Sequence, residues 1–152
     1  LAPHIERGRV LDLFAGTGAL GLEALSRGAA RATFVESSAP VVQVLRDNLR
    51  SLGFAEQATV VPLPVARALP KLSGQRFDLA LMDAPYGQGE LMPALEALGR
   101  LALVAPQGWI VAVHGTREQP PSPPAGWVAL DTRRFGDSAV TTYRHGDEEV
   151  AE

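Results

Sequence analysis

The residues from Val10 to Gly21, VLDLFAGTGALG, constrain the fold of this chain more than any other stretch. An apolar run at 9–14 indicates a buried strand, which gives way at once to a glycine-rich loop at 15–18 and then to the start of a helix. A strand that turns on glycine into a helix leaves backbone N–H groups and a helix N-terminus at one end of a sheet. This arrangement predicts a site for a nucleotide-like ligand at that end.

Strands and helices alternate along the first 115 residues. Apolar and β-branched runs indicate further strands, and the helical spacing of apolar residues indicates four helices, one of them with the stripe Val41, Leu45, Leu49 and Leu52. The predicted strands are 32–36, 58–63, 77–83 and 109–114. The predicted helices are 19–27, 65–72, 91–104 and a segment between Ser38 and Gly53. This alternation predicts an α/β fold, a Rossmann-like, mostly parallel sheet with helices on both faces.

The C-terminal third of the chain has a different pattern. A proline-rich loop at 119–124 is too poor in backbone donors to be a strand. Segments 127–134 and 139–144 flank the turn at 135–138 and alternate enough to predict an antiparallel hairpin that closes the sheet. We therefore expect a single domain over residues 1–152.

Composition excludes several classes of site. The chain has no cysteine, which excludes disulfides, thiolate metal sites and a cysteine nucleophile, and its three histidines are too scattered for a metal cluster. It has no apolar run of about 18 residues and no signal-peptide pattern. The net charge of −3 and the dispersed arginines mean that any surface for a polyanion must be local. We expect a cytoplasmic monomer with no metal and no membrane anchor.

The glycines Gly16, Gly18 and Gly21 satisfy G-x-G-x-x-G between a strand and a helix, the context that a nucleotide site requires. The alternative is a tight turn without a ligand. Glu36 ends the second strand, where a carboxylate can accept both hydroxyls of a ribose. The alternative for Glu36 is an acid that is favoured only because a helix begins beside it.

Asp12 discriminates between the ligands that carry such a ribose. An acid within an apolar strand is unexpected unless its oxygens accept loop N–H groups or a ligand ammonium group. S-adenosylmethionine has an α-amino group for this place, whereas the pyrophosphate of a dinucleotide would be repelled. A nicotinamide-dependent oxidoreductase would also need a second half and a proton relay, and the sequence offers neither. Asp12 therefore favours S-adenosylmethionine.

The segment Asp83-Ala-Pro-Tyr86 is the second informative site, at the end of the fourth strand. Asp83 and the loop carbonyls can accept hydrogen bonds from an exocyclic amine, Pro85 stiffens the turn, and the ring of Tyr86 can stack on a base. The alternative is a strand-end turn with Tyr86 as a packing residue.

The remaining candidates are weaker. His114 ends the fifth strand and is expected to be a satisfied edge residue, and Trp109 is expected in the core. Arg133, Arg134 and Arg144 form either a solvated hairpin face or contacts to phosphate.

The stretch 11–29 resembles the cofactor-loop signature of the bacterial small-subunit ribosomal RNA guanine-N2 methyltransferases. Later segments fall where that family has its later motifs: Phe34–Glu36, Asn48–Leu49, Asp83–Tyr86 and Arg134–Gly136. The resemblance implies the class I methyltransferase fold, a seven-stranded sheet in the order 3-2-1-4-5-7-6 with strand seven antiparallel. It also implies S-adenosylmethionine as cofactor and, as substrate, a guanine of small-subunit ribosomal RNA in a partly assembled particle.

By this resemblance, two sets of residues carry the function. The first set binds the cofactor, with Glu36 on its ribose: Asp12, Phe14, Ala15, Gly16, Gly18 and Glu36. The second set holds the target base and carries the catalysis: Asp83, Pro85 and Tyr86.

The sequence departs from the family in three places. Ala84 replaces the first of two prolines, the segment after the third strand has no acid to contact the adenine amine, and an N-terminal extension with an Arg-Pro-Thr segment is not present. Two alternatives therefore stay open. One is an amino-methyltransferase that acts on another nucleic-acid base or on a protein amide, and the other is a degenerate relative that binds RNA without catalysis.

Overall fold

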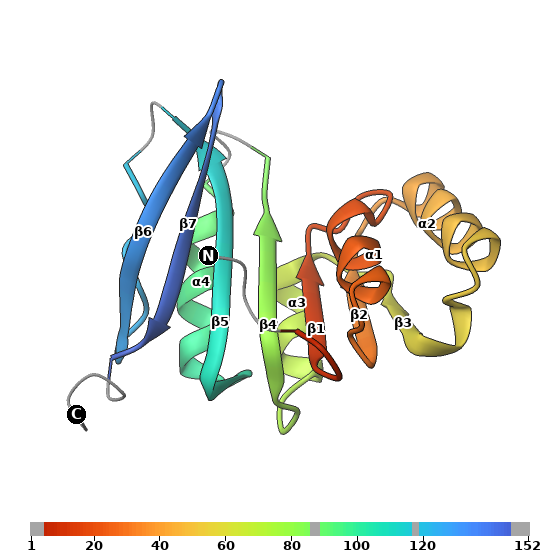
Figure 1. Ribbon diagram of the computed structural model, residues 1–152, viewed down its shortest axis with the longest axis horizontal. Helices are drawn as coiled ribbons and strands as arrows, with labels where there is room; N and C mark the ends of the chain where they lie inside the picture. Colours follow the sequence, from red (N-terminus) through yellow and green to blue (C-terminus); the bar gives the residue numbers. More distant parts are fainter. Residues whose placement is uncertain (1–4, 86–88, 117–118, 147–152) are drawn as a thin grey trace.

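The computed structural model describes residues 5–85, 89–116 and 119–146, and a seven-stranded sheet runs through them in the order β3-β2-β1-β4-β5-β7-β6 (Figure 1). Neighbouring strands are parallel except that β7 is antiparallel to both β5 and β6, so the predicted strand order is confirmed. The strands are β1 (Arg9–Leu13), β2 (Arg31–Val35), β3 (Ala58–Val61), β4 (Phe77–Asp83), β5 (Val104–Gly115), β6 (Trp127–Phe135) and β7 (Ser138–His145).

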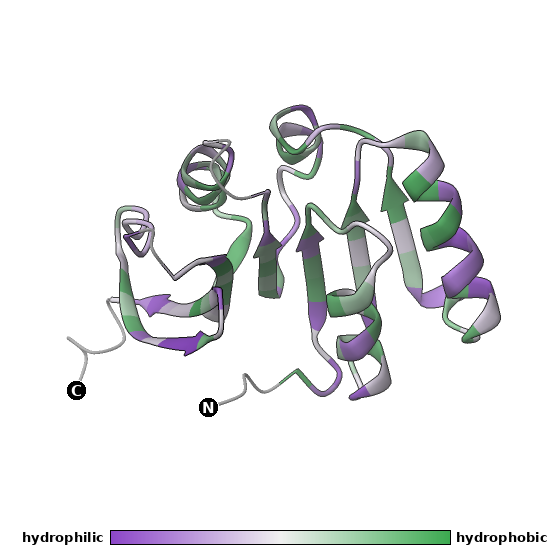
Figure 2. Cartoon of the chain, turned by 90° about the horizontal axis from the view of Figure 1, so that it is seen from above, coloured by the Kyte–Doolittle hydropathy of each residue, from purple (hydrophilic) through white to green (hydrophobic). Residues whose placement is uncertain are grey.

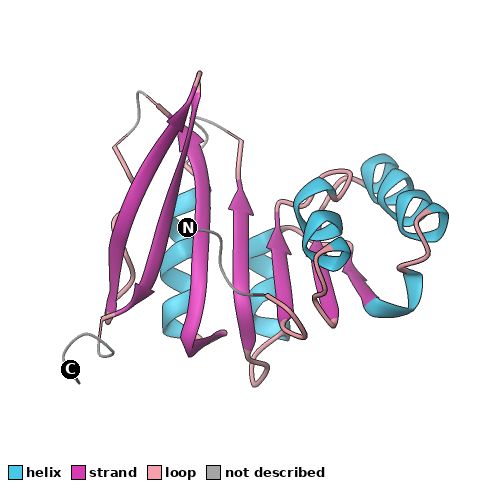
Figure 3. Ribbon diagram, viewed as in Figure 1, coloured by secondary structure: helices cyan, strands magenta, loops and turns pink. Residues whose placement is uncertain are grey.

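Helices cover both faces of the sheet (Figure 3). They are α1 (Ala19–Ser26), α2 (Ala39–Ser51), α3 (Val65–Lys71) and α4 (Leu91–Arg100), with a 3-10 turn at Ala55–Gln57. On one face Leu25 and Leu45, from α1 and α2, pack with Phe34 of β2. On the other face Leu69 and Leu95, from α3 and α4, belong to a separate cluster with strand residues of β1 and β4. Seen from above, apolar residues concentrate in the central strands between the helix layers (Figure 2).

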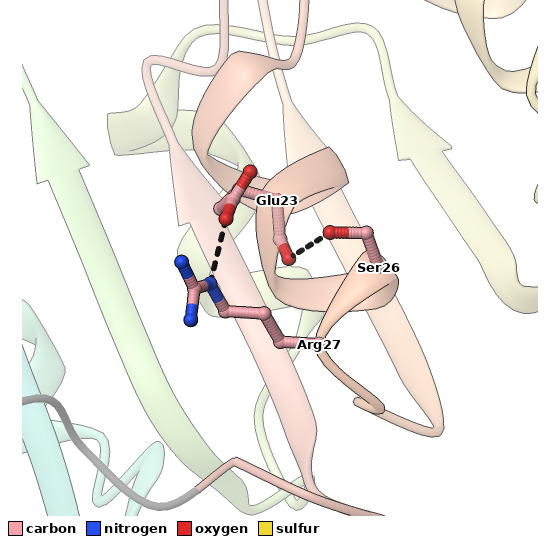
Figure 4. Close-up of polar contacts among 3 residues, drawn as sticks. All are labelled: Glu23, Ser26 and Arg27. Carbon is pink, nitrogen blue, oxygen red and sulfur yellow. Dashed lines mark hydrogen bonds and ion pairs between the residues drawn. The ribbon is translucent and has the colours of Figure 1, made fainter.

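Packing rather than surface pairing holds the first helix. In its last turn Arg27 Nε lies 2.6 Å from Glu23 Oε2, and Ser26 Oγ donates to the Glu23 carbonyl at 2.7 Å (Figure 4). Both charged side chains are more than half exposed, and such a pair contributes about 0.5 kcal/mol at most. Burial of Ala24 and Leu25 against the sheet therefore dominates.

Several strand and helix ends differ from the sequence prediction. β1 ends at Leu13 because Phe14 adopts a left-handed conformation with φ of 58°. α4 ends at Arg100 rather than at 104, since Ala102 turns with φ of 52° and Val104 already pairs with Phe77 of β4. β5 thus begins five residues earlier than predicted, and an irregularity in its pairing precedes Trp109. β3 is also shorter than predicted and ends at Val61.

The second helix buries a slightly different stripe from the predicted one. Val42, Leu45 and Leu49 are buried, whereas Val41 is only partly buried and Leu52 is 58% exposed. Leu52 is wrong as a core residue because α2 ends at Ser51, so the helical spacing no longer applies. Among the described residues, no helix is long and apolar enough to cross a membrane.

Parallel pairing brings the carboxyl ends of the first four strands to one edge of the sheet. Leu13 lies beside Val35 and Met82, and Val35 lies beside Val61. The turn between β6 and β7 reaches the same edge, because Ser138 pairs with Gly115 at the end of β5. This edge is at the top of Figure 1, where the glycine loop leaves β1.

Candidate cofactor and catalytic site

Hydrogen bonds within the glycine loop and to neighbouring elements fix the loop after β1. The Ala15 N–H donates to the Val35 carbonyl at 2.9 Å, and the Gly18 N–H donates to the Ala15 carbonyl at 2.9 Å. The Asn48 amide of α2 donates to the Thr17 carbonyl at 3.0 Å. Asn48 was predicted only as part of a motif, and its contact to the loop depends on where α2 packs. The loop is therefore preformed between β1, β2 and α2.

Two glycines of the motif have different physical roles. Gly16 has φ of 59°, and a Cβ atom at this position would meet nothing within 4 Å. A Cβ on Gly21 would lie 2.4 Å from Cε2 of Phe34 and 2.9 Å from Oδ2 of Asp12. Gly21 thus permits α1 to pack closely on the sheet, whereas Gly16 leaves open space on the loop that a ligand could occupy.

Asp12 lies beneath the glycine loop, where it is only 1% exposed. Its Oδ2 accepts the N–H of Gly21 in α1 at 2.9 Å, so its partner is a helix donor and not one of the loop N–H groups that the sequence suggested. Burial raises the pKa of the Asp12 carboxyl from 3.8 to about 8; the Gly21 hydrogen bond opposes this shift, and the charges of Asp83 and Glu36 add to it. Asp12 therefore supports the start of α1 and is largely protonated at neutral pH.

Glu36 bridges the glycine loop and the start of α2. Its Oε1 accepts the Gly16 N–H at 2.8 Å, and its Oε2 accepts the Ser38 N–H at 2.9 Å. The helix N-terminus favours this negative charge, as the alternative interpretation of Glu36 proposed. A carboxylate has about four lone-pair positions, so two backbone bonds leave capacity for ribose hydroxyls.

A cavity of about 330 Å³ opens at this edge, within the range of small-molecule sites. Residues that follow all four strands β1 to β4 line it, together with one residue from the start of α4. They are Phe14, Val35, Glu36, Ser37, Leu63, Pro64, Val65, Asp83, Pro85 and Glu90. Of the predicted site residues, the cavity brings together Phe14, Glu36, Asp83 and Pro85. Ala15, Gly16 and Gly18 belong to the loop beside it, and Asp12 lies in β1 beneath that loop.

The turn from Asp83 to Pro85 lies between this cavity, which Asp83 lines, and a second one of about 310 Å³, which Ala84 lines. Asp83 ends β4 with a partly exposed carboxyl group, and its partial burial raises its pKa. Pro85 lines both cavities. Tyr86, the predicted stacking residue, lies outside the described residues, so its role stays a prediction.

The second cavity lies between the start of α4 and the proline-rich loop. Leu91, Met92 and Val113 line it together with residues 119–122. The buried Tyr143 hydroxyl of β7 donates to the Pro121 carbonyl at 2.6 Å, which ties this loop to the sheet. The cavity therefore has one wall on a helix and one on an anchored loop.

His114 also lines the second cavity but is buried and partnered. Its Nε2 lies 2.7 Å from Thr141 Oγ1, and its Nδ1 lies 3.1 Å from the Gly115 carbonyl oxygen. These bonds support the interpretation of His114 as a satisfied structural residue. Trp109 is only partly buried, and the Arg144 guanidinium stacks 4.1 Å from the centre of its ring.

Glu90 is not among the residues that the sequence predicts for the site. It immediately precedes α4, seven residues after Asp83, and contributes to both cavities. The sequence signal was an acid before a helix, which usually has only a helix-capping interpretation. Its place at the site depends on how α4 packs against the sheet.

Comparison with known proteins gives a consistent result. A family model described as Conserved hypothetical protein 95 matches residues 1–144. The chain is 35% identical to Ribosomal RNA small subunit methyltransferase D of Escherichia coli K12 over 144 residues, which covers 95% of this chain and 72% of that protein. It is 32% identical to the protein of the same name from Haemophilus influenzae over 146 residues, 95% of this chain and 74% of that one. A solved conserved hypothetical protein from Streptococcus pyogenes superposes with a TM-score of 0.85 at 33% identity, covering 91% of this chain and 87% of the other.

Proposed function

Because the chain belongs to the Conserved hypothetical protein 95 family, that of the ribosomal RNA small subunit methyltransferases D, we propose that it methylates the N2 amine of a guanine in small-subunit ribosomal RNA. Membership makes the chain an S-adenosylmethionine-dependent RNA methyltransferase. The target base, the target atom and the partly assembled particle as substrate are the proposed part.

The residues of the first cavity fit S-adenosylmethionine. Glu36 offers carboxylate oxygens beside a preformed loop, Phe14, Leu63 and Val65 offer apolar surface for a flat base, and the open space at Gly16 lets the ligand approach the backbone. Asp12 acts through the start of α1, since it accepts the Gly21 N–H there. The bound cofactor would supply an already activated sulfonium methyl group. The work left to the protein is positioning, which can be worth roughly 7–11 kcal/mol of the barrier.

The single observation that carries the proposal is the position of the Asp83–Pro85 turn between two cavities. A target base in the second cavity would present its amine to the Asp83 carboxylate at the boundary with the cofactor. Asp83 accepts an N–H of the amine, which orients the nitrogen lone pair toward the methyl group and stabilises the positive charge that develops on nitrogen. Pro85 restricts the turn, so the carboxylate stays in this orientation.

The hairpin of β6 and β7 is suited to contact the RNA outside these cavities. Its tip carries Arg134 and Phe135, both exposed, at the sheet edge that holds Asp83. An exposed aromatic ring stacks on an unpaired base, and an arginine contacts phosphate. Three strand spacings of about 4.8 Å separate β6 from β4, so the tip lies on the order of 14 Å from the catalytic turn across the sheet. This surface would hold nucleotides near the target.

The test is transfer of a labelled methyl group, followed by nucleoside analysis of the product. Transcribed small-subunit RNA and partly assembled particles are offered separately, and calorimetry with S-adenosylhomocysteine measures cofactor binding. N2-methylguanosine is the expected product. Asp83→Asn should lower turnover by about a hundredfold or more and leave cofactor affinity within about twofold, because Asp83 acts on the target amine. Asp47→Asn, an exposed change on α2, is the control.

Three results would contradict the proposal. Methylation of another base would show that the chain is an amino-methyltransferase with a different target. Cofactor binding without transfer to any RNA would favour a degenerate RNA-binding relative. Equal loss of cofactor affinity in Asp83→Asn would remove Asp83 from its catalytic role.

A further inference from the structure

The turn between β3 and α3 is poor in acceptors for an adenine amine. Residues 64–67 include no acid, although this turn lines the first cavity through Leu63, Pro64 and Val65. The Pro64 carbonyl already accepts the N–H groups of Arg67 at 3.0 Å and Ala68 at 2.9 Å. A carbonyl has two lone pairs, so this oxygen has no capacity left for a ligand.

The carbonyl of Val61, the last residue of β3, is occupied in the same way. Val61 accepts the N–H groups of Glu36 at 3.2 Å and Leu63 at 2.9 Å. Neither of these two carbonyls therefore has capacity to accept the amine of an adenine that lies against this turn. A buried amine without an acceptor costs about 1–3 kcal/mol, so an acceptor from another element would be expected.

Glu90 lines the same cavity as this turn. It lines the first cavity with Pro64 and Val65, and it also lines an apolar cavity of about 490 Å³ between α3 and α4 with the same two residues. Glu90 and the start of α3 thus line the same two neighbouring cavities. Its carboxylate is an acceptor only, which suits an amine and not a ring nitrogen.

The two other carboxylates of the first cavity already have partners or a role. Both oxygens of Glu36 bond to backbone N–H groups at the β1 and β2 ends. Asp83 ends β4 next to Ala84 and Pro85, which line the second cavity, where the target base is proposed to lie. Among the described residues that line the first cavity, Glu90 is the remaining acid.

We infer that Glu90 accepts the N–H of the adenine C6 amine and so determines the specificity of the cofactor site. This inference rests on the proposed function for its ligand. Glu90, immediately before α4, thus supplies the acid that the segment after β3 does not contain. A ligand whose base has no such donor would leave the carboxylate unpaired and bind more weakly.

The experiment measures binding, by calorimetry, of S-adenosylhomocysteine and of its analogue in which hydrogen replaces the C6 amine. Neither ligand carries the sulfonium charge, so general attraction to an acid is reduced. Glu90→Ala should weaken S-adenosylhomocysteine binding by about tenfold and leave the affinity for the analogue unchanged. Glu90→Gln retains an acceptor oxygen and should lose about threefold or less. Glu23→Ala, an exposed acid on α1 that pairs with Arg27 and lines none of these cavities, is the control.

The outcomes separate the inference from the proposed function. Equal weakening of both ligands by Glu90→Ala, or no effect on either, overturns the role of Glu90 and leaves the methyltransferase assignment intact. Failure of the unsubstituted protein to bind S-adenosylhomocysteine overturns both. Thermal unfolding of each variant checks that a loss of affinity is not a loss of fold.

Discussion

At the scale of single residues, Asp12 links the glycine loop to the pH dependence of stability. Its pKa is about 8 in the folded protein and near 3.8 when unfolded, because folding buries the carboxyl group. The folded state therefore binds more protons between these values, and stability falls as pH rises from about 4 to about 8. One such group contributes a slope of at most about 1.4 kcal/mol per pH unit, and the slope vanishes above its folded pKa.

Asp12→Asn should remove this slope. The amide oxygen can still accept the Gly21 N–H, but the side chain no longer titrates. Urea unfolding of both proteins across this pH range measures the effect. As pH rises, the difference between the free energy of unfolding of the variant and that of the unsubstituted protein should shift in favour of the variant. Parallel pH profiles for the two proteins would mean that Asp12 is not protonated in the folded state.

Single residues also show which features of the site the sequence alone could predict. An acid in an apolar strand identified Asp12 as unusual, but its partner Gly21 lies in the following helix and needed the fold. The motif treats Gly16 and Gly21 alike, whereas packing on Phe34 separates a structural glycine from one beside open space. The place of Glu90 at the site could not be predicted, because it depends on how α4 packs against the sheet.

At the scale of elements, the type and order of strands and helices were predictable because each carries its own periodicity. Ends were less so. The apolar run through Leu101 and Leu103 satisfies the end of α4 and the start of β5 equally well, and only the left-handed turn at Ala102 separates them. Local sequence does not encode that choice, since pairing of Val104 with Phe77 stabilises the strand from a distance.

The β6–β7 hairpin is the element that we expect to bind RNA through its tip. Phe135 is 62% exposed, so its ring adds little to the core and is available for stacking. Phe135→Ala should weaken RNA binding by about 1–3 kcal/mol and leave stability and S-adenosylhomocysteine affinity nearly unchanged. Filter binding to transcribed small-subunit RNA measures the loss.

Leu130→Ala is the control for the hairpin, because Leu130 is 47% exposed on the same strand but farther from the tip. It should leave RNA affinity unchanged. If both substitutions weaken binding equally, the loss comes from the strand as a whole and stacking on Phe135 is the wrong explanation.

At the scale of the whole molecule, charge is the property that most restricts how RNA can bind. The chain carries a net charge of −3, so general attraction to a polyanion is weak and the contacts must be local. Arg133 and Arg134 at the hairpin are the adjacent cationic pair, although Arg133 also lies 3.5 Å from Asp131. Recognition would then depend on cavities and stacking more than on phosphate contacts.

This charge distribution predicts a shallow salt dependence of RNA binding. Each phosphate contact to single-stranded nucleic acid contributes about −0.7 to the slope of log K against log salt, so two or three contacts give roughly −1.4 to −2. Arg134→Gln should reduce the magnitude of the slope by about 0.7. Arg100→Gln, at the C-terminal end of α4, should not change the slope. A titration of RNA affinity over salt concentration measures both. A slope near −7 would require about ten contacts and would contradict recognition through a local hairpin surface.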